Sequence, residues 1–257
     1  MEIRKMNAAR GWTWIKQGYQ LTMHNPLMAV TLALIGALAI FAAIETPVLG
    51  PLLAVILMPL LMAGYMRVCH ALEKEEDIEL TQLFEGFQKH AGRLLALGGF
   101  SILGLLAASA TMVFIGGDAL ATLLESFKTT NDPQMLVDAM WTAGSGVALS
   151  LLVGFALVCV LMLALQFAPM LVFFNDVPPL VAVRASLSGS LRNIIPYTVY
   201  SIIMQVIALL LSLLPFNIGL VILLPLGLTS LYVSYRNIFP FAHELAAMEP
   251  VIQNPEV

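Results

Sequence analysis

Charged residues are what this sequence has least of. Only 11% of its 257 residues are Asp, Glu, Lys or Arg, whereas a water-soluble domain carries about 25%. A water-exposed surface cannot be built from so few charges, and 60% of the residues are hydrophobic, so lipid is the expected surrounding of most of the chain. The net charge of −4 gives no indication of nucleic-acid binding.

Cysteines and catalytic motifs are also scarce. The two cysteines, Cys69 and Cys159, lie at the end of one apolar run and inside another, and they do not indicate a disulfide framework. The four histidines form no metal-ligand spacing, and the sequence has no P-loop, GxGxxG or GxSxG motif. We therefore expect no metal, no cofactor and no enzymatic activity.

Six apolar stretches are long enough to cross a bilayer, because about 20 helical residues span its hydrocarbon. Their only charged residue is Arg67, near the end of the second, which argues against a proton-coupled pump. The fourth is too long for one upright span, and we expect Pro169 to kink its last third. The expected spans are residues 26–44, 48–68, 94–115, 143–174, 194–214 and 216–235. The predicted fold is thus an all-α integral membrane domain over residues 1–240, with a short cytoplasmic tail over 241–257.

The basic residues are sorted to one side of these spans. Eleven of the 12 Lys and Arg residues lie on one side: ten fall before the first span, in alternate loops or after the last span, and Arg67 lies at the end of the second span. Only Lys128 lies on the other side. Because basic residues are enriched in cytoplasmic loops, we expect both termini in the cytoplasm.

Three amphipathic segments precede the first, third and fifth spans. Each has an apolar stripe on one face of a helix and is too short and too polar to span, so we expect three cytoplasmic helices lying flat at the membrane interface. The stripes are Trp12, Ile15, Tyr19 and Met23; Leu80, Leu83, Phe84, Phe87 and Ala91; and Leu180, Val183, Leu187, Leu191 and Ile194. In the first, Trp14 faces the other way. In the third, Asn175 or Asp176 is expected to cap the helix and Pro179 to occupy its first turn.

These segments suggest an internal repeat. Each is followed by two spans, and the second span of each pair carries a late proline: Pro59, Pro169 and Pro225. Three copies of interfacial helix, span and span would account for this pattern, as internal symmetry is common in membrane folds. Composition alone could also produce the proline match.

Small residues recur at intervals of four in two spans, at Gly104 and Ala108 and at Gly146, Ser150 and Gly154. They let helix backbones approach closely, and we favour packing within one chain over dimerisation. The outward loop, residues 118–140, has a helical stripe (Leu120, Leu123, Leu124 and Phe127), a turn at Asn131, Asp132 and Pro133, and a second apolar pattern (Leu136, Val137 and Met140). It fits a helical hairpin that serves as a partner-binding cap, as a gate or simply as a covered loop.

Few polar side chains are available for function. Gln166 and Gln205 lie inside spans, where they either bond to other helices or contact a neutral solute or a lipid. The expected cytoplasmic arginines are Arg67, Arg93, Arg184, Arg192 and Arg236. They fit anionic lipid headgroups, because guanidinium groups hold phosphate well, but the positive-inside distribution with snorkelling also explains them.

Three stretches carry a resemblance: GWTWIKQGYQLTMHNP, LTQLFEGF and SLYVSYRNIF. With them the chain resembles an uncharacterised family of small multi-pass bacterial inner-membrane proteins. More distantly, its layout is similar to the membrane domain found with glycerophosphoryl diester phosphodiesterases, whose soluble enzymatic part is absent from this sequence. The resemblance implies an inner-membrane location and brings no activity and no catalytic residues.

Two functional hypotheses follow from these observations. The leading one is a non-enzymatic membrane protein that organises lipid or docks a protein partner, at residues 72–93 or at the outward loop 118–140. The alternative is a channel or carrier for a neutral or lipid-like solute, which would use Gln166 and Gln205. An enzyme would need convergent polar groups at the cytoplasmic mouth of the bundle.

Overall fold

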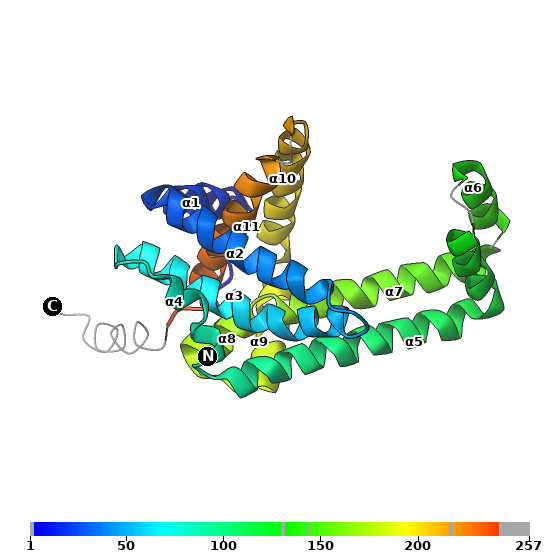
Figure 1. Cartoon of the computed structure of the whole chain (residues 1–257), viewed down its shortest axis with the longest axis horizontal. Coiled ribbons are helices and arrows are strands. Elements are labelled where there is room, and N and C mark those ends of the chain that lie inside the picture. Colours follow the sequence, from blue (N-terminus) through cyan, green and yellow to red (C-terminus); the bar gives the residue numbers. More distant parts are fainter. Residues whose placement is uncertain (1–2, 130–131, 143, 216–217, 242–257) are drawn as a thin grey trace. The chain divides into compact units, whose positions relative to one another are not determined.

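The computed structural model describes residues 3–129, 132–142, 144–215 and 218–241, and all regular structure within them is helical (Figure 1). The helices are α1 (Arg10–His24), α2 (Pro26–Ile44), α3 (Gly50–Lys74), α4 (Leu80–Leu83), the 3-10 helix η1 (Glu85–Phe87), α5 (Ala91–Thr129), α6 (Pro133–Thr142), α7 (Gly144–Leu165), α8 (Ala168–Asn175), α9 (Pro179–Arg192), α10 (Ile194–Ser212) and α11 (Ile218–Ile238).

The six predicted spans are confirmed as six helical segments long and apolar enough to cross a membrane: α2, α3, α5, α7 with α8, α10 and α11. α2 has the predicted bounds, whereas α3 and α5 continue beyond theirs. The predicted break in the fourth span is also present. α7 ends at Leu165, and α8 begins at Ala168 with Pro169 in its first turn, where a missing backbone N–H costs nothing. Pro59 and Pro225, by contrast, lie inside continuous helices.

The chain forms two compact units, one made of Met1–Gly99 with Ala164–Val257 and the other of Phe100–Leu163. We call them the first and the second unit and describe each by itself. The expectations of one domain over residues 1–240 and of a tail over 241–257 stay predictions, and residues 242–257 lie outside the described part.

Small residues pack the two long helices of the second unit. A Cβ atom on Gly104 of α5 would lie 2.5 Å from Leu161 Cδ1 of α7, and one on Gly154 of α7 would lie 2.2 Å from the Met112 side chain of α5. Ala108 and Ser150 are buried, whereas Gly146 faces open space. The predicted packing within one chain is therefore confirmed at four of the five positions.

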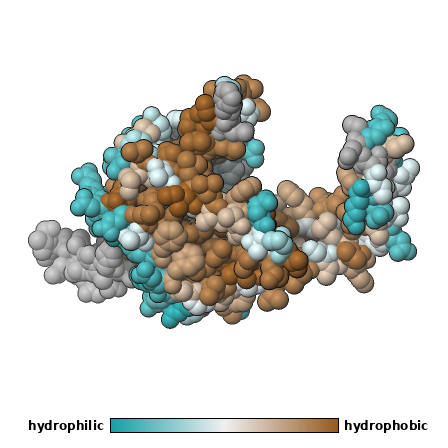
Figure 2. Space-filling view, viewed as in Figure 1, coloured by the Kyte–Doolittle hydropathy of each residue, from teal (hydrophilic) through white to brown (hydrophobic). Residues whose placement is uncertain are grey.

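The outward part of the second unit is a helical hairpin, as predicted. α5 continues through a non-helical Gly117 to Thr129, and α6 follows. Leu120 and Leu123 are buried against Val147, whereas Leu124 and Phe127 are exposed. Figure 2 shows hydrophilic side chains gathered around α6 and hydrophobic ones along α5 and α7. Asn131 and the side chains of Pro133, Leu136 and Met140 lie outside the described residues.

In the first unit, α1 packs against α10 and α11 through two glycines. A Cβ on Gly11 would lie 2.4 Å from the Pro196 carbonyl oxygen, and one on Gly18 would lie 2.3 Å from Ser230 Oγ. The buried face is Gly11, Trp14, Ile15, Gly18, Leu21 and Thr22. Of the predicted apolar stripe, only Ile15 belongs to this buried face, whereas Trp12, Tyr19 and Met23 are 46–55% exposed. The interfacial position of α1 stays a prediction.

The segment over residues 80–91 is not the continuous helix that we predicted. It forms the single turn α4, then η1, and a break before α5, with His90 at φ 59°. The cause is close packing on α3: a Cβ on Gly86 would lie 2.1 Å from the Leu60 carbonyl oxygen, and one on Gly64 would lie 1.8 Å from that of Leu83. Leu83 is buried, whereas Leu80, Phe84 and Phe87 are exposed.

α9 forms as predicted, and the face that it packs on the protein is not its apolar stripe. Its buried residues are Ala182, Ser186, Gly189 and Ser190, and the predicted stripe residues Leu180 and Leu191 are each more than half exposed. Pro179 occupies the first turn as expected, but no side chain caps the helix. Asn175 instead accepts a hydrogen bond from Tyr235, and Asp176 accepts one from Arg93.

Candidate functional site

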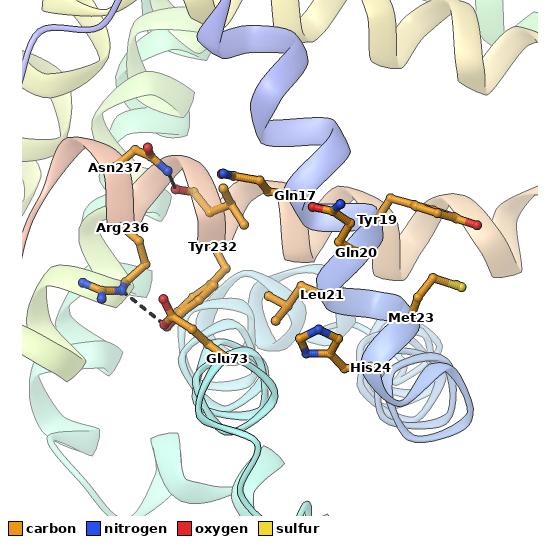
Figure 3. Close-up of a pocket in the computed structure, with 11 residues that line it drawn as sticks. Gln17, Tyr19, Gln20, Leu21, Met23, His24, Glu73, Tyr232, Arg236 and Asn237 are labelled. Carbon is orange, nitrogen blue, oxygen red and sulfur yellow. Dashed lines mark hydrogen bonds and ion pairs between the residues drawn. The ribbon is translucent and has the colours of Figure 1, made fainter.

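A pocket of about 560 Å³ opens between α1, α3 and α11 of the first unit (Figure 3). In the figure, α1 lies on one side of the pocket and the side chains of Glu73, Tyr232 and Arg236 lie on the other. The lining residues are Gln17, Tyr19, Gln20, Leu21, Met23, His24, Glu73, Tyr232, Val233, Arg236 and Asn237. The lining thus combines amides, one ion pair and a partly apolar rim.

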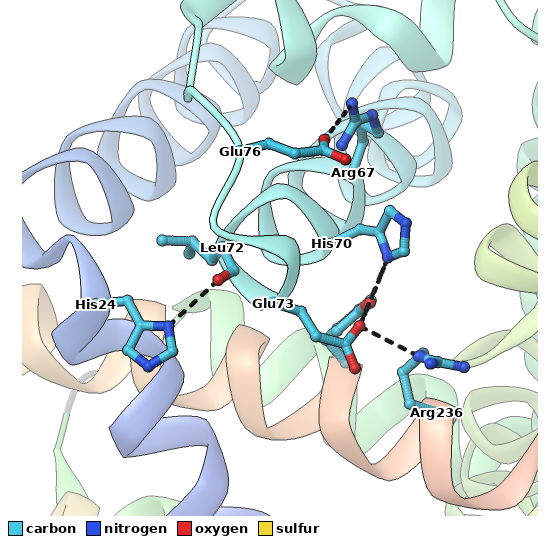
Figure 4. A network of polar contacts seen from close by, with 8 residues as sticks. His24, Arg67, His70, Leu72, Glu73, Glu76 and Arg236 are labelled. Carbon is cyan, nitrogen blue, oxygen red and sulfur yellow. Dashed lines mark hydrogen bonds and ion pairs between the residues drawn. The ribbon is translucent and has the colours of Figure 1, made fainter.

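Glu73, at the end of α3, is the centre of a polar network (Figure 4). Its Oε2 accepts a hydrogen bond from Tyr232 OH at 2.5 Å and lies 3.3 Å from Arg236 Nε. His70 Nδ1 lies 2.9 Å from Tyr232 OH. Because the hydroxyl proton of Tyr232 goes to Glu73, Nδ1 of His70 is the donor in this contact.

The network is held by the packing around it. Tyr232 is 1% exposed, and the Arg236 guanidinium stacks 3.9 Å from the centre of the Phe241 ring. On α1, His24 Nδ1 lies 3.2 Å from the Leu72 carbonyl oxygen, which places α1 beside the end of α3. The site thus brings together residues of three helices, α1, α3 and α11. The buried rings of Tyr232 and Phe241 limit the movement of the Glu73 and Arg236 side chains.

Comparison with known proteins gives one informative match. The chain is 30% identical over 213 residues to a probable inner membrane protein of Burkholderia thailandensis, and the match covers 81% of this chain and 77% of the relative. The chain belongs to the family of this inner membrane protein. No protein-family model matches the chain, and no solved structure matches its fold.

Membership in this family and the six apolar helices make the chain a multi-pass inner membrane protein. The resemblance to an uncharacterised family of such proteins is thereby confirmed. The more distant likeness to the membrane domain of phosphodiesterases stays a prediction.

Three of the five predicted headgroup arginines of this inner membrane protein lie in ion pairs. Arg67 contacts Glu76 at 3.0 Å and Glu85 at 3.6 Å, Arg93 contacts Asp176 at 2.5 Å, and Arg236 contacts Glu73. These pairs neutralise much of the charge that a phosphate would seek. Arg184 and Arg192 are exposed on α9, and neither forms an ion pair with another described residue.

The two glutamines predicted inside spans, Gln166 and Gln205, have different surroundings. Gln166, between α7 and α8, donates a hydrogen bond to Ser190 Oγ at 2.7 Å, which is the contact between helices that we considered. Gln205 is exposed on α10. The hydrogen bond between helices is thus present at Gln166, and the solute or lipid contacts of the carrier hypothesis stay a prediction.

The sequence analysis singled out Tyr19, Met23 and Arg236 among the pocket residues but not Glu73 or Tyr232. It also did not single out His70, which contacts Tyr232. Among the described residues, no group of three His, Cys, Asp or Glu side chains could hold a metal ion. A usable signal was the acid at the end of one expected span and the Tyr and Arg at the end of another, both on one side of the membrane.

Proposed function

We propose that this inner membrane protein is non-enzymatic and organises anionic lipids at its cytoplasmic face, with both termini in the cytoplasm. One observation carries the proposal: each of the three segments before a span packs one face on the bundle and leaves several large apolar side chains exposed on another. A surface of that kind suits the boundary between headgroups and acyl chains.

α1 is the first of these segments. Its glycines contact α10 and α11, while Trp12 is 53% and Tyr19 is 55% exposed. Lys16 is exposed on the same face, one helical turn from Trp12. Trp and Tyr favour the interface because their rings are amphipathic, and lysine places its charge among the headgroups.

The segments around α4 and α9 repeat the arrangement. Leu83 and Gly86 pack against α3 while Phe84 and Phe87 point outward. On α9, Ser186 and Gly189 are buried and an outward face is formed by Leu180, Val181, Arg184, Ser188, Leu191 and Arg192. This shared design supports the proposal of three interfacial segments and favours a threefold repeat.

Arg184 and Arg192 are the arginines best placed to bind anionic headgroups. They lie on one outward face of α9 beside Leu180 and Leu191, and they have no acidic partner among the described residues. Each basic residue near an anionic surface contributes about 1 kcal/mol. Both together would therefore raise anionic lipid retention by roughly thirtyfold, since about 1.4 kcal/mol corresponds to a factor of ten.

The test is native mass spectrometry of the full chain released from nanodiscs that contain phosphatidylglycerol and phosphatidylcholine. Arg184→Gln with Arg192→Gln should remove most of the retained phosphatidylglycerol. The matched control is Lys128→Gln, because Lys128 is exposed near the end of α5 and is expected on the opposite face. Equal retention by the double variant and the wild type would defeat the lipid proposal. A protein captured stoichiometrically by residues 72–93 or 118–140 would favour partner docking instead.

A further inference from the structure

We infer that the pocket between α1, α3 and α11 binds a primary ammonium group, carried either by an ethanolamine phospholipid or by a small soluble amine. This site is separate from the basic surface of α9: it would bind a cation, whereas the α9 surface would bind an anion. It rests on the proposed function only in placing the pocket at the level of the headgroups.

The first argument is the carboxylate. All contacts of Glu73 with His70, Tyr232 and Arg236 use Oε2, and Oε1 has no partner among the described residues. Glu73 is 36% exposed at its side chain and lines the pocket. An oxygen of this kind can still accept hydrogen bonds from a cation, although Arg236, which also lines the pocket, pairs with Oε2 and offsets part of the carboxylate charge.

The second argument is the set of acceptors around that oxygen. Gln17 and Gln20 line the pocket from α1, and each offers an amide oxygen. Asn237 also lines the pocket and donates its Nδ2 to the Val233 carbonyl at 2.7 Å, which leaves its Oδ1 as an acceptor. A primary ammonium has three N–H donors and can use several such oxygens, whereas a trimethylammonium has none.

The third argument is depth. Glu73 lies five residues after Val68, the last residue of the expected second span, so it sits about 7 Å further along the helix. That distance is close to the thickness of one headgroup layer. Tyr19 and Met23 line the same pocket and are 55% and 46% exposed, which gives the glycerol end of a lipid an apolar rim.

The experiment uses the full chain in nanodiscs of equimolar phosphatidylethanolamine and phosphatidylcholine, and native mass spectrometry measures the ratio of the retained lipids. The two lipids differ only in the methylation of the headgroup nitrogen. A charge-assisted hydrogen bond predicts about tenfold enrichment of the ethanolamine lipid. Glu73→Gln should abolish the enrichment, and Asp77→Asn should keep it, because Asp77 is an exposed acid nearby that does not line the pocket.

A second variant guards against misfolding, since Glu73→Gln leaves Arg236 without its carboxylate. Gln20→Trp fills the pocket from an exposed position and leaves the ion pair intact, and it should also abolish the enrichment. In nanodiscs of phosphatidylcholine alone, thermal stabilisation by ethanolamine that depends on Glu73 would identify a soluble amine as the source. If neither enrichment nor stabilisation depends on Glu73 and Gln20, the inference is overturned. Retention of phosphatidylglycerol is measured with the α9 variants and does not depend on the amine site. The proposed function and the amine site can therefore each be refuted without the other.

Discussion

Gly18 gives the sharpest test of how α1 is held on the bundle. A Cβ added there would lie 2.3 Å from Ser230 Oγ and 2.7 Å from both the Cα and the backbone nitrogen of Ser230. Rotation of the serine side chain relieves the first contact but not the other two, which are backbone atoms. Gly18→Ala must therefore push α1 away from α11. That shift would also stretch the buried 3.0 Å hydrogen bond between the Thr22 and Thr229 hydroxyls.

The size of the effect follows from three contributions. Overpacking costs about 1–3 kcal/mol, and loss of a hydrogen bond between membrane helices costs about 0.6 kcal/mol. Replacement of a helical glycine by alanine stabilises the helix by about 0.5–1 kcal/mol, which offsets part of this cost. The net loss of about 1–3 kcal/mol should lower the midpoint of thermal unfolding by about 2–12 °C, since each kcal/mol shifts it by about 2–4 °C in a chain of this size.

The assay is thermal unfolding followed by circular dichroism in one detergent, with Gly99→Ala as the matched control. A Cβ on Gly99 meets nothing within 4 Å, so that variant should be unchanged or slightly more stable. A Gly18→Ala protein as stable as the Gly99→Ala protein would refute the close packing of α1 on α11.

Two further changes test polar contacts. Asn193→Ala removes a fully buried side chain that accepts from the Met6 backbone N–H at 2.7 Å and donates to the Arg4 carbonyl at 2.9 Å. It should cost about 2–3 kcal/mol and make the first residues more susceptible to trypsin; an unchanged digestion pattern would contradict this role. Gln166→Leu breaks the bond to Ser190 and should cost about 1 kcal/mol without changing lipid retention, and a lost lipid would instead revive a ligand role for Gln166.

The spans were predictable because length and apolar composition alone decide whether a helix can cross a bilayer. The break before Pro169 was predictable because proline has no backbone donor. The ends of α3 and α5 were not, since a helix can continue past the lipid once other parts of the protein pack against it. The end of α3 carries Glu73, and that extension is what brings it to Tyr232 and Arg236.

The packed faces of α1 and α9 could not be predicted from their apolar stripes. A stripe shows where the large apolar residues lie, whereas close contact between helices uses small residues that let the backbones approach. Gly11, Gly18 and Gly189 therefore mark the packed faces, and Trp12 and Leu191 mark the outer ones. Two of the ion pairs, Arg93–Asp176 and Arg236–Glu73, could not be predicted either, because their partners lie 83 and 163 residues apart in the sequence.

The central claim is that α1, the segment around α4 and α9 lie at one membrane interface with their large side chains in lipid. The most direct measurement is the depth of spin labels at Tyr19, Phe87 and Leu191 in bilayers, from the relative collision rates with oxygen and with a water-soluble nickel chelate, after Cys69→Ala and Cys159→Ala. The account predicts one common depth near the headgroups of the cytoplasmic leaflet, with a label at Lys128 in water on the opposite side. Labels at different depths or in different leaflets, or three labels fully exposed to water, would contradict it.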